Sequence, residues 1–310
     1  MSLHLTAAAK TDVGRQREQN EDACYTHIVV NDQKSSGICI VADGMGGYHA
    51  GEVASQIAVD TISSALQSIL GPTSSQPTVR LRGKRRRGRE QQSFSGRQTD
   101  DDPRKTRPLS EELDQDDQDS GATVQLSEAL ILEHYSERLR QAIEQASQAI
   151  VDYGDKHREA KGLGSTVTAA LVIGEQAFIA NVGDSRTYLL RDGKLGRVTT
   201  DHSLVERLVE AGQIDRADVY DHPNRNLIYR SLGAGRSEVD VDIFTEKLQD
   251  GDVLMLCSDG LWEMVKDAQM ESIITEVTDL VETCDLLIER ANENGGEDNI
   301  TVVLLRCVEG

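Results

Sequence analysis

Short runs of β-forming residues, separated by two-residue turn signals, fill the sequence beyond Gly164, and this pattern restricts the fold more than any other feature. The runs cover residues 166–173, 177–182, 187–190 and 198–200. The turns between them are Gly174-Glu175, Gly183-Asp184 and Asp192-Gly193. Tight turns of this kind join antiparallel neighbours in a sheet. We therefore predict an antiparallel meander over this part of the chain.

Apolar stripes at helical spacing predict two long helices before the meander. One stripe lies within residues 52–70 and the other between residues 126 and 150. The remaining predicted elements are a strand over 38–42, a helix over 203–211, strands over 239–247 and 252–258, a helix over 279–294 and a closing strand over 299–307. The repeated strand–helix–strand unit of a parallel sheet is missing, so the pattern predicts the α+β class.

One segment, from Gly71 to about Thr123, differs in composition from the rest of the chain. It contains a basic block, Arg80–Arg89, with seven basic residues in ten, followed by acidic runs that end at Asp119. Its apolar residues are too sparse to bury a core, so we expect a disordered insertion at about 71–123. The remainder suits one domain. We therefore predict a single domain over residues 1–310, interrupted by this insertion.

Charge and cysteine content exclude several classes of protein. The formal net charge of −20 disfavours attraction to the phosphate backbone of nucleic acids. Five cysteines, without a Cys-x-x-Cys spacing, argue against a disulfide scaffold and against structural zinc. No segment approaches the 18 consecutive apolar residues of a membrane span, and the first ten residues lack the apolar stretch of a signal peptide. We expect a cytoplasmic, monomeric protein with reduced, mostly buried thiols and no membrane partner.

Four aspartates lie at predicted strand ends or turns: Asp22, Asp43, Asp259 and Asp298. Each of them alone is an ordinary turn residue beside glycine or asparagine. Several carboxylates directed at one point would repel each other, and a divalent cation removes that conflict. Oxygen ligands favour Mg2+ or Mn2+ over zinc. Spacing alone does not bring the four turns together.

Six ordered motifs resemble those of the metal-dependent protein serine/threonine phosphatases of the PPM (type 2C) family, and most closely its compact bacterial members. They lie at residues 11–22, 41–47, 164–166, 182–186, 256–261 and 298–303. An ordered set of six motifs is far more specific than any single Asp-Gly pair. The resemblance spans residues 6–307 except for the insertion.

The resemblance implies a four-layer α-β-β-α sandwich, with two central antiparallel sheets flanked by helices and two metal ions, Mn2+ or Mg2+, at one end. Asp43 matches the carboxylate that bridges the two ions, and the Gly44 carbonyl matches a ligand of the second ion. Asp259 and Asp298 match further ligands of the first ion. The remaining matches are Asp22 at the second ion, with Glu21 as a neighbouring candidate, and Asp184, which with Asp259 would hold a third, weaker ion.

The implied reaction is hydrolysis of phosphoserine and phosphothreonine by a hydroxide that bridges the two ions, which counteracts protein kinase signalling. Arg17 matches the residue that binds the substrate phosphate with its planar fork. Many bacterial relatives have a histidine directly after the Gly46-Gly47 pair, whereas here Tyr48 comes first and His49 second. The identity of the general acid therefore stays open. Residues 200–235 match a variable flap beside the active site, which would set substrate access.

Two other functions compete with this interpretation. A catalytically inactive relative that serves as a binding module would typically lack metal aspartates, but all four are present here. A nucleic-acid binder could use Arg80–Arg89, but this block has no interleaved aromatic residues and lies beside neutralising acids. The expected partners are phosphorylated proteins and a serine/threonine kinase or its substrates.

Overall fold

A computed structural model describes residues 3–31, 34–46, 50–70, 78–79, 124–125 and 128–310. The chain forms two compact units, one from Met1–Ser74 with Leu132–Gly310 and the other from Ser75–Ile131. In the second unit, β4 (Thr78–Val79) pairs with β5 (Val124–Gln125). Apart from β4, the predicted insertion, with its block Arg80–Arg89, lies outside the described residues. Its disorder and the single-domain organisation remain predictions.

The first unit contains two sheets, in which every pairing among the described residues is antiparallel. The first sheet has the order β1 (Leu3–Asp12), β14 (Ile300–Glu309), β13 (Val253–Cys257), β9 (Arg186–Arg191), β10 (Lys194–Arg197). The second has the order β11 (Leu232–Gly233), β6 (Gly164–Ser165), β3 (Lys34–Met45), β7 (Val167–Ile173), β8 (Gln176–Val182), β12 (Asp242–Lys247), and β2 (Asp22–Asn31) also pairs with β3.

An apolar layer between the two sheets holds them face to face. Residues at alternate positions of the strands, such as Val41 and Cys39 on one sheet and Leu254 and Leu256 on the other, bury their side chains there. This alternation is the period of two that a strand imposes on its side chains. The five cysteines are free thiols, four of them buried, as predicted from the sequence.

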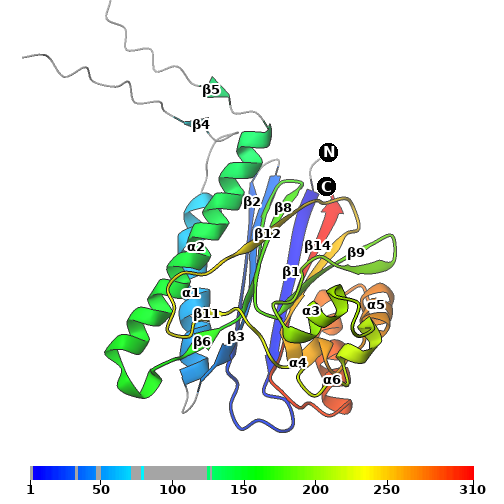
Figure 1. Cartoon of the computed structure of the whole chain (residues 1–310). Coiled ribbons are helices and arrows are strands. Elements are labelled where there is room, and N and C mark those ends of the chain that lie inside the picture. The colour runs from blue at the N-terminus through cyan, green and yellow to red at the C-terminus, as the bar shows by residue number, and fades with distance from the viewer. Residues whose placement is uncertain (1–2, 32–33, 47–49, 71–77, 80–123, 126–127) are drawn as a thin grey trace, which may run out of the picture. The chain divides into compact units, whose positions relative to one another are not determined.

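Helices cover the outer faces of both sheets. α1 (Ala50–Leu70) and α2 (Glu128–Lys156) share a core with the second sheet, through residues such as Ile62 and Ile143. α4 (Asp259–Trp262), α5 (Asp267–Glu276) and α6 (Leu280–Glu293) pack on the first sheet. α3 (Leu204–Glu210) and a short 3-10 helix, Arg216–Val219, lie in the predicted flap. The predicted α-β-β-α sandwich is therefore confirmed (Figure 1).

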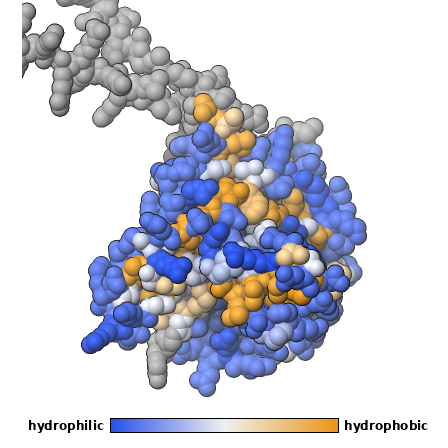
Figure 2. Space-filling view, viewed as in Figure 1, coloured by the Kyte–Doolittle hydropathy of each residue, from blue (hydrophilic) through white to orange (hydrophobic). Residues whose placement is uncertain are grey.

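The surface in Figure 2 is mostly hydrophilic, with apolar patches between the polar side chains. None of the helices that the structure describes combines the length and the apolarity needed to cross a membrane.

Three local predictions are wrong. Residues 198–200 do not form a strand, because the Val198 and Thr199 N–H groups both donate to the Thr187 carbonyl and the Thr187 N–H donates to the Thr199 hydroxyl, which interrupts the regular β9–β10 pairing. The predicted meander is two hairpins, since the Gly183-Asp184 turn carries the chain from β8 in one sheet to β9 in the other. Asp43 does not follow its strand; β3 continues to Met45 because Gly44 and Met45 pair with β6.

Candidate active site

Asp22 and Asp43 face each other across two neighbouring strands. They are register partners in the β2–β3 pair, so both carboxyls lie at the same end of the second sheet. The Oδ2 atom of Asp22 accepts hydrogen bonds from the Ser258 and Thr301 hydroxyls, each at 2.7 Å. Thr301 lies on β14 of the first sheet, and Ser258 directly follows β13 of the same sheet. Asp22 therefore joins the two sheets where they open toward the site.

The backbone around Asp43 is held by β6 and by the residue that follows it. The Asp43 carbonyl accepts hydrogen bonds from the Thr166 N–H at 2.8 Å and from the Ser165 hydroxyl at 2.9 Å. Gly44 packs so closely against the first turn of α1 that a Cβ at this position would collide with the Gly51 carbonyl. Only glycine fits there, which explains the residue type at the predicted carbonyl ligand.

Glu21 has a different environment from Asp22. Its carboxylate accepts a hydrogen bond from the Gly51 backbone N–H, near the start of α1, where the helix dipole favours negative charge. Burial nevertheless raises the pKa of Glu21. Its own carbonyl accepts the Gly44 N–H at 3.1 Å. Glu21 thus lies beside Gly44, the predicted carbonyl ligand.

Three further carboxyls lie beside strand ends of the first sheet: Asp184 shortly before β9, Asp259 shortly after β13 and Asp298 shortly before β14. Asp259 is the first residue of α4, and its Oδ1 atom is buried with no hydrogen-bond partner among the described residues. Asp298 accepts the Asn299 N–H at Oδ1, 2.8 Å away, and the Arg17 guanidinium at Oδ2, 2.6 Å away. Asp184 is only 5% exposed, and its carbonyl accepts the Trp262 indole N–H at 3.0 Å.

Electrostatics show that these carboxyls are close to one another. Burial raises the pKa of Asp43 well above its usual value, and repulsion from Asp259, Asp22, Asp184 and Asp298 adds to the effect. Burial and repulsion from Asp184 and Asp298 do the same to the pKa of Asp259. A cation would remove this penalty, because it favours the charged form of every one of these groups.

Burial also raises the pKa of the two remaining aspartates. It raises the pKa of Asp22 to about 6, although the two hydroxyl donors oppose the shift. It raises the pKa of Asp184 to about 7, with Asp201 adding to the effect. Both groups therefore titrate much closer to neutral pH than an exposed aspartate.

The donor set fits a hard divalent ion. The unpartnered Asp259 Oδ1 is an oxygen available for ligation, and every candidate donor is a carboxylate or carbonyl oxygen. Within the described ranges, no three Asp, Glu, His or Cys side chains lie close enough together to enclose an ion by themselves. Waters and the Gly44 carbonyl would have to complete the coordination, and Mg2+ characteristically retains several waters in its protein sites.

Arg17 lies in a loop that Asn299 holds in place. Asn299 Nδ2 donates to the carbonyls of Val13, at 2.9 Å, and Gln19, at 2.8 Å, while its Oδ1 accepts the Glu21 N–H at 2.8 Å. The Arg17 side chain is 49% exposed and reaches Asp298. Sequence analysis assigned no role to Asn299, although it stands directly after a predicted ligand.

Arg225 is a second residue that sequence analysis missed. It comes from the flap and donates to Glu263 and Glu297, each at 3.1 Å. The Asp259 carboxylate also attracts the Arg225 guanidinium. Only its place in the polar flap could have drawn attention to it. His49 and Tyr48 lie outside the described residues, so the general acid is untested.

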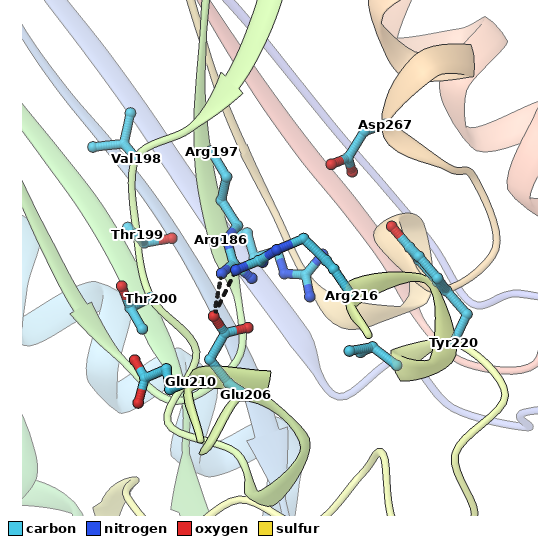
Figure 3. A pocket seen from close by; sticks show the side chains of 11 residues that line it. Arg186, Arg197, Val198, Thr199, Thr200, Glu206, Glu210, Arg216, Tyr220 and Asp267 are labelled. Carbon is cyan, nitrogen blue, oxygen red and sulfur yellow. Dashed lines mark hydrogen bonds and ion pairs between the residues drawn. The ribbon is translucent and has the colours of Figure 1, made fainter. Parts of the chain in front are cut away.

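A cavity of about 450 Å³ is lined by flap residues together with Arg186 and Asp267, and none of the candidate ligands lines it. Figure 3 shows Arg197 and Arg216 directed at Glu206, with the buried Arg186 beside them. Arg186 binds Asp201 through Nε, at 3.0 Å, and Nη2, at 2.7 Å, and its guanidinium lies 3.4 Å from the centre of the Trp262 ring. The arginines on this wall are therefore already paired with carboxylates.

Comparison with known proteins agrees with this geometry. The family model described as protein phosphatase 2C matches residues 13–294. The serine/threonine phosphatase Stp of Listeria monocytogenes serovar 1/2a is 35% identical over 301 residues, which cover 97% of this chain and 95% of the relative.

Solved structures agree as well. The serine/threonine phosphatase PstP/Ppp of Mycobacterium tuberculosis has a TM-score of 0.69 at 29% identity and covers all of both chains. A PstP catalytic domain in complex with two manganese ions has a TM-score of 0.69 at 27% identity, covering 99% of this chain and all of that one. By the extent and identity of these matches, the chain belongs to the protein phosphatase 2C family of metal-dependent serine/threonine phosphatases.

Proposed function

We propose that this chain removes phosphate from phosphoserine and phosphothreonine in proteins, using the carboxyls and Arg17 at the open end of the sandwich. The observation that carries the proposal is the group of mutually repelling aspartates around the unpartnered Asp259 Oδ1. Such a group is costly in a folded protein unless cations neutralise it. A catalytically inactive binding module would have no reason to retain it.

The ligand assignments follow the family pattern. Asp43 would bridge two Mn2+ or Mg2+ ions, with the Gly44 carbonyl and Asp22 on one side and Asp259 and Asp298 on the other. Asp184 would hold a third ion together with Asp259. When bound, these ions supply a water of lowered pKa as the nucleophile and compensate the charge of the substrate phosphate.

The chain's own residues prepare the site for these partners. The Ser258 and Thr301 hydroxyls fix the Asp22 carboxyl and lower its pKa, which opposes the effect of burial. Arg17 presents a planar fork that can bind two phosphate oxygens, and its contact with Asp298 holds it beside the aspartates until substrate arrives. Arg225 ties the flap to Glu263 and Glu297 at the rim of the site.

We further propose that the protein acts as a monomer in the cytoplasm on proteins phosphorylated by a serine/threonine kinase. Five unpaired cysteines support a reducing compartment.

The test is hydrolysis of p-nitrophenyl phosphate and of a phosphothreonine peptide with and without Mn2+. Activity that needs Mn2+, disappears with a chelator and returns when the metal is restored supports the proposal. Metal-independent activity, or no activity together with a salt-sensitive shift of DNA, would overturn it.

A further inference from the structure

His202 is a buried residue, 2% exposed, that connects the start of the flap to the turn before Asp184. Its backbone N–H donates to the Gly183 carbonyl at 2.8 Å. In return, the Gly183 N–H donates to the ring atom Nδ1 of His202 at 3.0 Å. Both polar backbone groups of Gly183 are therefore bound by one residue of the flap.

The ring's other nitrogen fixes its orientation. Because Nδ1 accepts a hydrogen bond, the neutral ring carries its hydrogen on Nε2. That hydrogen is donated to Asp242 Oδ2, at 3.1 Å, on the edge strand β12. Arg230 Nη1 lies 2.8 Å from both Nε2 and Asp242 Oδ1, and since a guanidinium only donates, its hydrogen bond goes to Asp242.

The surroundings favour the neutral ring that this arrangement needs. Burial lowers the pKa of His202, and the Arg230 charge lowers it further, against the opposing effects of Asp242 and Asp201. A protonated ring would place an N–H at Nδ1, opposite the Gly183 N–H. The Gly183 and Asp242 hydrogen bonds therefore support the Nε2–H tautomer, while burial and the Arg230 charge support a neutral ring.

The turn that His202 holds has little freedom of its own. Gly183 has φ of 110°, and a Cβ there would lie 2.6 Å from Thr166 Cβ. At the next residue, Trp262 donates to the Asp184 carbonyl. The turn is thus held at Gly183 by His202, with Asn181 also donating to the Gly183 carbonyl, and at Asp184 by Trp262.

We propose that His202 is a positioning residue, which sets the place of the Asp184 carboxyl by holding the Gly183 N–H and is itself oriented by Asp242 and Arg230. The inference rests on the proposed function, in which Asp184 holds the third ion. It assigns to the flap and to β12 a direct role in forming that ion's site.

Two substitutions of His202 test the roles of its two ring nitrogens separately. In His202→Asn, the amide oxygen lies near the position of Nδ1 and can still accept the Gly183 N–H, but the contact with Asp242 is lost. In His202→Gln, the longer side chain keeps a donor near Asp242 and loses the acceptor for Gly183. His222→Gln is the matched control, because the ring of this flap histidine accepts a local backbone N–H, from Asn224.

The first readout needs neither metal nor activity. Trp262 is the only tryptophan in the sequence, so its emission reports on the turn that it binds. Without metal, we expect His202→Gln to shift the emission maximum, and His202→Asn and His222→Gln to leave it where it is in the parent protein. Asp242→Ala should shift it in the same direction but less, because the imidazole, unlike the asparagine amide, then loses the partner that keeps Nδ1 as the acceptor. This variant serves where His202→Gln does not fold.

The second readout is the Mn2+ concentration for half-maximal activity. We expect this concentration to rise about fivefold in His202→Gln, because that is the effect of losing one hydrogen bond. In His202→Asn it should rise less than about twofold. In an Asp184→Ala background, His202→Gln should have no further effect.

Equal changes in His202→Asn and His202→Gln would overturn the proposal, because they would show a purely structural role. So would an undiminished effect of His202→Gln in the Asp184→Ala background. If the parent protein hydrolyses no phosphate ester, the proposed function fails, while the Trp262 emission still tests the role of His202.

Discussion

The Arg17 guanidinium donates to Asp298 Oδ2 across 2.6 Å, so the candidate phosphate-binding residue is held by a candidate metal ligand. The pair is partly exposed, with side-chain exposures of 49% and 29%. Solvent weakens such a pair, which makes it easy to exchange for a stronger partner. A cation that takes Asp298 would release the Arg17 fork toward a phosphate that arrives at the same place.

Replacing Arg17 by alanine should therefore weaken substrate binding without weakening metal binding. We expect KM for a phosphothreonine peptide to rise about tenfold, with a smaller fall in kcat, because a phosphate grip acts in both ground and transition states. The Mn2+ requirement should stay the same or decrease, since a positive charge leaves the site. The KM of Arg17→Lys should lie between those of the parent and of Arg17→Ala, because lysine keeps the positive charge and loses the planar fork.

Steady-state kinetics at saturating Mn2+ measures the first effect, and an Mn2+ titration of activity measures the second. Arg15→Ala is the control, since it removes the same charge from the same loop. An unchanged KM in Arg17→Ala would remove Arg17 from the site.

Asp43→Asn and Asp259→Asn should each lower the activity and raise the stability of the metal-free protein. Each should leave less than about a tenth of the parent rate, which is about 1.4 kcal/mol of barrier. Without metal, each should raise Tm, because it deletes one of several buried carboxyls that repel each other. A rise of about 2–4 °C corresponds to about 1 kcal/mol in a domain of this approximate size.

Asp192→Asn is the control for that experiment, since Asp192 is an exposed turn residue with φ of 52°, which asparagine also adopts. It should change neither activity nor Tm. A lower Tm in both site variants would mean that the carboxyls stabilise the metal-free fold, contrary to their raised pKa values.

Much of the layer architecture was predictable from periodicity. The helical stripe within residues 52–70 became α1, and the runs predicted at 166–173 and 177–182 became β7 and β8. Neither β1 nor β2 was predicted. In β1, the run Ala7, Ala8 and Ala9 breaks the alternation that residues 3–6 begin, and the long pairing with β14 overrides this weak local signal.

The convergence of the aspartates could not be read from spacing. Asp22 and Asp298 are far apart in the sequence, and only the pairing of β2 with β3 and the packing of the two sheets bring their ends together. The family resemblance supplied that relation. Contacts that depend on side-chain reach, such as Arg225 with Glu263 and His202 with Gly183, had no sequence signal of their own.

The stability of the metal-free protein should fall as pH rises through neutrality. Asp22 and Asp184 have folded-state pKa values of about 6 and about 7, above the 3.8 of an ordinary aspartate. The folded state therefore binds more protons than the unfolded state in this interval, and the stability present at low pH is lost as pH rises through the folded-state values. Thermal melts without metal should give a higher Tm at about pH 5.5 than at about pH 8.

Saturating Mn2+ should reverse that order, because metal binding requires ionised carboxylates. Asp184→Asn should weaken the dependence in the metal-free protein. His202 contributes with the opposite sign, since its lowered pKa makes acid destabilising. A Tm without metal that rises from pH 5.5 to 8 would contradict the assignment of raised pKa values to the two aspartates.

The last prediction concerns the segment with opposite charge blocks. Deleting residues 73–121 and joining the ends with a short Gly/Ser linker should preserve folding and Mn2+-dependent hydrolysis of p-nitrophenyl phosphate. The segment holds none of the motif positions, and the compact unit of Met1–Ser74 with Leu132–Gly310 contains both sheets. Shortening a loop changes its closure entropy slowly with length, so we expect a change in stability of about 1 kcal/mol.

Any larger effect of the deletion should appear only with protein substrates. The basic residues at 80–89 and the acidic runs after them can steer an encounter with a charged partner, and salt screens such steering. A difference between parent and deletion variant on a phosphoprotein should therefore shrink as ionic strength increases. A variant that keeps the length but replaces the charged residues of the segment with serine and glycine should behave like the deletion. If the deletion variant precipitates, or melts far below the parent, then the segment contributes to the folded core and the predicted disorder is wrong.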